Sequence, residues 1–118
     1  QDMRRFLKSD EDMVPAVQYR IRHNPDDHGV INYITCQDGF TLNDLVSYNY
    51  KHNEANGEGN QDGISYNCSW NCGAEGSTRK TSIKELRLKQ MKNAFSLLLF
   101  SQGTPLIFQG DEWGNTQK

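Results

Sequence analysis

The chain has 118 residues, 35% of them hydrophobic, with 13 basic and 15 acidic side chains and a formal net charge of -2. No basic face suggests nucleic acid or anionic lipid as a partner, and no apolar run approaches the roughly 20 residues that a membrane helix needs. A mean hydropathy of -0.83 is low for an α/β domain that folds alone. Three cysteines and no signal-peptide pattern favour a reducing, cytoplasmic compartment.

The first predicted helix covers residues 10–23. Asp10 or Asp12 is placed to cap its free amides, and Pro15 is tolerated in a first turn. The apolar residues that recur on one side of this helix are Met13, Val14, Val17 and Ile21. Residues 24–29 then carry several turn formers and predict a loop.

A short strand is predicted at Val30–Thr35, where the near-continuous apolar run is typical of a parallel strand covered on both faces. Asp38 and Gly39 follow it and lead into a polar loop. In parallel α/β enzymes the loops that shape the pocket begin at the carboxyl ends of strands. Asp38 is therefore a catalytic candidate, and a simple turn residue before Gly39 is the alternative.

Residues 49–81 form one long polar segment with no helical or strand period, containing six Asn and five Gly up to Lys80. Loops of this length are often functional rims or lids, and disorder is the alternative. Cys68 and Cys72 are spaced for a local bridge or half a metal site, but no second Cys/His pair accompanies them. Asp62 and Gly63 lack the alternating acids of a calcium loop. No metal or other cofactor is expected.

The second predicted helix begins at a capping box, Ser82-x-x-Glu85, and ends before Gly103, which supplies the stop. Six apolar residues of this helix lie broadly on one face: Ile83, Leu86, Met91, Ala94, Phe95 and Leu98. Leu97, Leu99 and Phe100 widen this apolar face near the end of the helix. Residues 106–108 predict a second short buried strand. The predicted order of elements is helix, strand, long loop, helix and strand. This order is typical of a crossover connection between two parallel strands. Two strands cannot form a sheet that is covered on both faces, so we expect an incomplete α/β fold. The apolar face of residues 83–100 would then be exposed and available for self-association.

Several long, ordered motifs carry a resemblance to a known family. They are YITCQDGFTL at residues 33–42, DLVSYN at 44–49, KHNEANGE at 51–58, SWNCG at 69–73, SQGTP at 101–105 and GDE at 110–112. Together they resemble the debranching branch of the α-amylase superfamily, which contains isoamylases, type I pullulanases and bacterial glycogen debranching enzymes. Arg4–Lys8 is similar to the segment that precedes the sixth barrel helix. The resemblance covers nearly the whole chain.

The resemblance implies an α/β fold that is a fragment of a (β/α)8 TIM barrel, with helix 6, strand 7, a long loop, helix 7 and strand 8. Residues 1–118 would then form a partial catalytic barrel domain. Family members hydrolyse α-1,6 branch points of glycogen, starch or pullulan with retention. Of the three catalytic carboxylates, only the one after strand seven has a counterpart here, Asp38, whose family role is to bind hydroxyls of the sugar ring at the cleavage subsite.

The residue before Asp38 departs from the family pattern, which usually has histidine where this chain has Gln37. Glutamine donates and accepts hydrogen bonds but never carries charge, so we expect an altered cleavage subsite. His52 and Asn53, in the loop after the strand, are expected to line the substrate groove, with a solvated loop histidine as the alternative. Trp70 and Trp113 either stack on sugars or pack their loops. The resemblance gives Asp111 and Glu112 no catalytic role, and His23 and His28 are expected to be solvated.

The leading interpretation is a piece of a glycoside hydrolase that acts on branched α-glucans and is inactive alone, because nucleophile and acid/base are absent. A second interpretation is a non-catalytic α-glucan-binding or oligomerising module derived from such a barrel. A third is a fragment with no function of its own.

Overall fold

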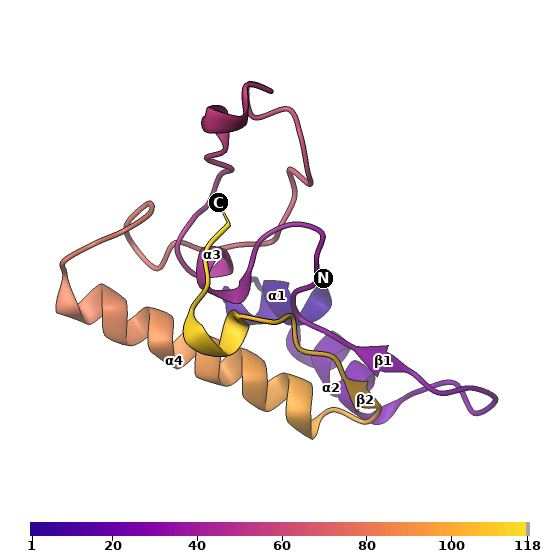
Figure 1. Cartoon of the computed structure of the whole chain (residues 1–118). Helices are drawn as coiled ribbons and strands as arrows, with labels where there is room; N and C mark the ends of the chain where they lie inside the picture. Colours follow the sequence, from indigo (N-terminus) through magenta and orange to yellow (C-terminus); the bar gives the residue numbers. More distant parts are fainter. Residues whose placement is uncertain (118) are drawn as a thin grey trace.

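The structure, a computed structural model, describes residues 1–117. Short helices and a small parallel sheet surround one long helix (Figure 1). The elements in chain order are α1 (Asp2–Leu7), α2 (Val14–Arg22), β1 (Ile31–Asn32), α3 (Leu42–Leu45), η1 (Glu54–Asn56), α4 (Thr81–Phe100), β2 (Thr104–Pro105) and η2 (Asp111–Trp113). No helix in this described part of the chain is long and apolar enough to cross a membrane.

The sheet consists of β1 and β2, which pair in parallel with Ile31 opposite Thr104 and Asn32 opposite Pro105. Backbone hydrogen bonds from Thr104 N to Val30 O (2.9 Å) and from Leu106 N to Asn32 O (2.7 Å) hold the register. The connection between the strands contains α3 and α4. The predicted parallel crossover is therefore confirmed, and the chain is a small α/β unit.

Both strands are shorter and more exposed than the sequence predicted. β1 covers two residues of the expected Val30–Thr35, and Ile31 is 62% exposed, so the strand is not covered on both faces. β2 lies at Thr104–Pro105, ahead of the predicted residues 106–108, and Leu106 and Ile107 are exposed. An apolar run predicts burial, but a strand exists only where a neighbour completes its ladder of hydrogen bonds.

The helix α2 lies within the predicted residues 10–23 but begins later, at Val14. Its N-cap is Met13, with no side-chain cap, and Pro15 occupies the first turn as expected. Asp10 is not a cap, because its carboxylate pairs with Arg5 at 3.1 Å and with Lys8 at 3.4 Å. The capping prediction was therefore wrong. Met13 and Val17 are buried and Ile21 is half-buried, whereas Val14 from the same predicted side is exposed.

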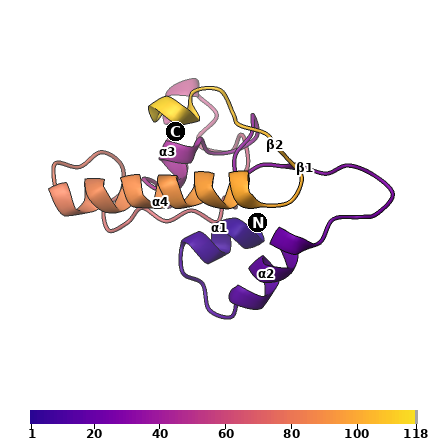
Figure 2. The same ribbon diagram turned by 90° about the horizontal axis from the view of Figure 1, so that it is seen from below.

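The long helix α4 presents the predicted apolar face to the core of the molecule. Ala94 and Leu98 are buried in a cluster with residues of the β1 end and of α3, namely Ile34, Phe40, Leu42 and Leu45. α1 packs on α4 as well, and Figure 2 shows α1 and α2 on one side of α4 with α3 and the C-terminal segment on the other. Most of the face proposed for self-association is thus covered by the chain itself, although Leu99 and Phe100 stay exposed.

The ends of α4 differ from the prediction. Its N-cap is Lys80, with no side-chain cap, so Ser82 lies within the helix and the Ser82–Glu85 capping box does not form. The helix ends at Phe100, before Gly103. Gly103 has φ +125°, and a Cβ there would lie 2.9 Å from Val30 O. Glycine at this position therefore permits the close approach of the chain to β1.

Two short helices were not predicted. α1 occupies Asp2–Leu7, and α3 begins after Thr41, whose side-chain oxygen accepts from Asp44 N at 3.2 Å. The predicted polar segment 49–81 is irregular apart from η1 and the first residue of α4, Thr81. In Figure 1 the part of this segment around η1 projects away from the helical body beyond α3, and the later part returns along the body to the start of α4.

Candidate glucan-binding groove

A groove of about 470 Å³ lies between the turn that follows β1 and the polar loop. Its lining residues come from three separate segments: Gln37, Gly39, Phe40, Lys51, His52, Asn53, Ala55, Asn56, Asp62, Gly63, Ile64 and Gln117. Three residues selected from the sequence, Gln37, His52 and Asn53, therefore lie together. Asp38 is exposed and does not line the groove, but it stands between two residues that do.

The turn after β1 is fixed by buried polar contacts. Arg4 donates from Nε to Ile34 O at 2.6 Å and from Nη1 to Asn67 O at 3.1 Å. Burial lowers the pKa of the Arg4 guanidinium, although interactions with nearby groups such as Cys68 and Asp111 act to raise it. Phe40 N donates to Asn67 Oδ1 at 3.1 Å. These contacts join the end of the strand to Asn67 in the middle of the polar loop.

Gly39 is required by the same turn. Its φ is +87°, a conformation that side-chain-bearing residues rarely adopt, and a Cβ there would lie only 2.5 Å from Asn67 Oδ1. The sequence predicts a possible turn at Asp38, just before this glycine. The partner that makes it indispensable, Asn67, is 28 positions away and was not predicted.

His52 lies on the groove wall in a defined orientation. Its Nε2 is 2.9 Å from Glu75 Oε1, and its ring centroid is 5.3 Å from that of Tyr48. The His52 side chain is 40% exposed, so it is partly in contact with solvent. His23 and His28 are exposed, as expected, although His23 stacks on Tyr19 at 4.3 Å and His28 contacts Asp27.

Asn53 belongs to a network of side-chain amides and acids within the loop. Its backbone N donates to Asn60 Oδ1 at 2.8 Å, and its Nδ2 donates to Asp62 Oδ1. The other oxygen of Asp62 accepts from Asn56 Nδ2 at 2.6 Å. Asn53 Oδ1 is buried without a hydrogen-bond partner among residues 1–117. An unused buried acceptor is costly unless a ligand or water supplies a donor.

Asp62 accepts hydrogen bonds from the side-chain amides of Asn53 and Asn56, one on each carboxylate oxygen. Within residues 1–117 there is no group of three or more His, Cys, Asp or Glu side chains arranged for a metal ion. Cys36, Cys68 and Cys72 are free thiols, so the possible Cys68–Cys72 bridge is not present. Burial raises the pKa of the Cys72 thiol, partly offset by Arg87.

The acids after β2 serve the fold. Asp111 is buried and accepts from Thr35 Oγ1 and, at 2.9 Å, from Leu42 N. Glu112 accepts from Gly110 N at 3.0 Å. Neither acid lines the groove.

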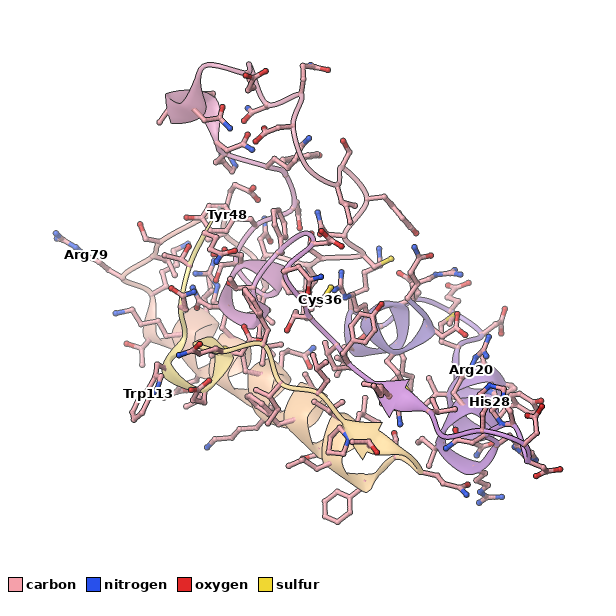
Figure 3. The ribbon with its side chains drawn as sticks, turned by 45° about the vertical axis from the view of Figure 1, so that its right-hand side comes forward. Arg20, His28, Cys36, Tyr48, Arg79 and Trp113 are labelled. Atoms are coloured by element: carbon pink, nitrogen blue, oxygen red, sulfur yellow. The ribbon has the colours of Figure 1, made fainter. Side chains whose placement is uncertain are left out.

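The two tryptophans behave differently. Trp70 is half-buried beside Leu45 and Cys68, which is the packing alternative. Trp113 is 87% exposed and lies at the outer edge of the molecule, with its ring turned away from the body (Figure 3). Neither residue lines the groove.

The residues that hold the loop in place, Glu75 and Arg87, carry no motif of their own in the sequence. Glu75 accepts hydrogen bonds at the start of the loop, and buried Arg87 of α4 donates to loop carbonyls. The nearest signal is the SWNCG motif at residues 69–73, which contains Asn71, the acceptor of an Arg87 hydrogen bond. By itself this motif indicates only the family resemblance. Arg87 falls on the apolar face of α4 and was therefore not distinguished by periodicity.

Comparison with known proteins gives close relatives, although no protein-family model matches the chain. Isoamylase 3, chloroplastic, of Oryza sativa is 48% identical over 125 aligned residues, covering 98% of this chain. The glycogen operon protein GlgX homolog of Mycobacterium tuberculosis is 64% identical over 87 residues, and isoamylase 1, chloroplastic, of Arabidopsis thaliana is 56% identical over 87, each covering 74% of this chain.

The chain spans only a small part of these relatives: 16% of the rice protein, 12% of the mycobacterial protein and 11% of the Arabidopsis protein. High identity over three quarters or more of the chain nevertheless agrees with the motifs read from the sequence. As a segment, the chain belongs to the isoamylase and GlgX debranching branch of the α-amylase family.

Proposed function

We propose that the chain supplies part of the substrate site of a retaining glycoside hydrolase that cleaves α-1,6 branch linkages in glycogen- or starch-type α-glucans. In the (β/α)8 barrel of such an enzyme it would provide helix six, strand seven, the long loop, helix seven and strand eight. One observation carries the proposal: Gln37 of the turn after β1 lines the same groove as His52 and Asn53 of the polar loop, 15 and 16 positions further along the chain.

The chemistry of the groove suits a sugar. Glucose hydroxyls both donate and accept hydrogen bonds, and the groove offers an amide at Gln37, an imidazole at His52 and an unpartnered acceptor at Asn53 Oδ1. Asp38, exposed beside Gln37, would accept hydrogen bonds from ring hydroxyls. Hydrogen bonds from ring hydroxyls to an ionised carboxylate strengthen as charge develops on the ring in the transition state.

The proposed role of Asp38 is distinct from the roles of nucleophile and acid/base. Retaining glycosidases need a pair of carboxylates at the scissile bond, and neither Asp111 nor Glu112 lines the groove. We therefore expect this chain alone to be inactive. A reducing-sugar assay on pullulan tests this expectation, and robust turnover by the purified 118-residue chain would contradict it.

A second candidate function is a non-catalytic α-glucan-binding or oligomerising module. Gln37, in the position where the family usually has histidine, favours it, because glutamine retains hydrogen bonding without charge. Affinity for maltooligosaccharides without hydrolysis supports this candidate. Exposed Leu99 and Phe100 offer a surface for self-association, and light scattering that shows a monomer at all concentrations would count against that.

The substitution Gln37→His separates the two candidates. In a chain that carries a complete barrel, we expect it to raise kcat/KM about fivefold, because a hydrogen bond from a charged imidazole contributes about 1 kcal/mol more than one from a neutral amide. An unchanged kcat/KM would remove the argument that Gln37 alters the cleavage subsite. We propose a cytoplasmic location from the three free thiols, whereas the plant relatives are chloroplastic proteins.

A further inference from the structure

Glu75 joins the two ends of the polar loop, 26 positions from Asn49. Its carboxylate accepts from Asn49 N at 3.1 and 2.9 Å and from Tyr50 N at 3.1 Å, where the loop begins. It also accepts from Asn71 Nδ2 at 3.0 Å, near the end of the loop. One side chain therefore fixes the separation of the two loop ends.

The same carboxylate orients His52. Glu75 Oε1 lies 2.9 Å from His52 Nε2, and an ionised carboxylate can only accept a hydrogen bond, so Nε2 carries the proton. In the neutral ring Nδ1 is then an acceptor. His52 lines the groove and Glu75 does not. Any influence of Glu75 on a ligand in the groove therefore acts through His52 and the loop backbone.

Glu75 keeps its charge under ordinary conditions. Burial by itself would raise its pKa, but hydrogen bonds from Asn49, Asn71, His52 and Tyr50 outweigh that effect and lower the pKa to about 2. The carboxylate is thus ionised at neutral and mildly acidic pH. It remains an acceptor for all of these donors throughout that range.

Arg87 of α4 connects this arrangement to the rigid body. Its buried guanidinium donates from Nη2 to Asn71 O at 3.0 Å, to Ser47 O at 3.5 Å and to Ala74 O. These carbonyls lie before the start of the loop and just before Glu75. The helix therefore holds the chain on both sides of the carboxylate.

We propose that Glu75 is a positioning residue of the groove, which closes the loop and holds His52 with Nε2 protonated so that Nδ1 accepts a sugar hydroxyl. This inference rests on the proposed function, because it takes an α-glucan as the ligand. Glu75 itself does not touch the sugar.

The experiment uses nitrogen-15 NMR of the His52 ring in the 118-residue chain, together with titration by maltohexaose. The variant is Glu75→Gln, and the matched control is Glu58→Gln, an exposed acid of the same loop outside this network. Glu75→Gln should convert His52 to a mixture of tautomers and weaken maltohexaose binding roughly tenfold. Glu58→Gln should change neither. Unchanged amide signals of Ala94 and Leu98 show that the body stays folded.

A double-mutant cycle with His52→Ala distinguishes positioning from general damage to the loop. Glu75→Gln should cost much less affinity when His52 is already absent, and Glu75→Asp, which keeps the charge, should restore part of the ring signature. An equal loss with and without His52, or a His52 ring with mixed tautomers in the unmodified chain, overturns the inference. A different result separates the two proposals: the unmodified chain does not bind maltohexaose, but Glu75→Gln still converts His52 to a mixture of tautomers. In that case the proposed function is wrong, and the role of Glu75 in orienting His52 is supported.

Discussion

The helical body and the polar loop are held together by different forces. The body has a buried apolar cluster that links α3, α4 and the end of β1, including Phe40, Leu42 and Leu98. The loop has side-chain amides and acids that bond to one another and to backbone, centred on Asp62 and Glu75. Apolar burial is insensitive to pH, whereas hydrogen bonds to a carboxylate depend on its ionisation.

This difference assigns separate tasks to the two regions. Close packing makes the body a rigid frame that fixes where the groove walls begin. Each loop hydrogen bond contributes only about 1 kcal/mol net, so the loop depends on many of them acting together. The groove takes one wall from each region, Phe40 from the body and His52 from the loop. Substitutions in the two regions should therefore have distinguishable effects.

The largest effect is expected in the body. Leu98→Ala removes a side chain that is 5% exposed in the apolar cluster, and we expect a loss of about 2–5 kcal/mol in the free energy of unfolding. Leu99→Ala, one position along the same helix, is the control, because Leu99 is 55% exposed and should change stability by about 0.5 kcal/mol or less. Urea unfolding measures both. Equal losses would show that Leu98 is not in a packed core.

A somewhat smaller effect is expected where the body meets the loop. Gly39→Ala combines a positive φ with a Cβ 2.5 Å from Asn67 Oδ1, so we expect a loss of about 2–4 kcal/mol. Gly57→Ala has a similar φ of +82° but no atom within 4 Å of its Cβ, and should cost only about 1 kcal/mol. Thermal unfolding of the two variants isolates the contribution of the close approach. A Gly39→Ala variant no less stable than Gly57→Ala would contradict it.

The smallest effect is a pH dependence confined to the loop. The pKa of Glu75 is about 2 in the folded chain against 4.5 ordinarily, so its stabilisation is present above pH 4.5 and is lost as pH falls toward 2. Between pH 5 and 2, amide exchange at Asn49 and Tyr50 should accelerate, while that at Ala94 changes less. In Glu75→Gln this difference should vanish. Parallel acceleration at all three amides would mean global acid unfolding instead.

The sequence predicted the strongly periodic elements well. The apolar face of α4 and the parallel crossover were both correct, because Ala94 and Leu98 recur at helical spacing and the chain order limits the topology. Helix ends were less predictable. Ser82–Glu85 matched a capping box with Ser82 as the N-cap, yet the N-cap of α4 is Lys80, two residues earlier, because a helix end is held by few bonds and shifts easily by one or two residues.

The groove was predictable only in part. Motifs selected Gln37, His52 and Asn53, whereas Glu75, Asn67 and Arg87 were missed because their roles consist of contacts with distant backbone atoms. Such contacts leave no periodic signal in a sequence. The role of Asp38 in binding sugar stays a prediction, since the structure establishes its exposure and its neighbours only.

The amino-acid sequence by itself determined the family, the α/β class, the long helix and the polar character of the loop, because each depends on residue order and local pattern. Tertiary structure alone decided that Gly39 must be glycine, that Glu75 closes the loop, and that Gln37 and His52 share a groove. The physical reason is distance along the chain: hydrogen bonds and steric contacts between residues far apart in sequence exist only after the body has packed.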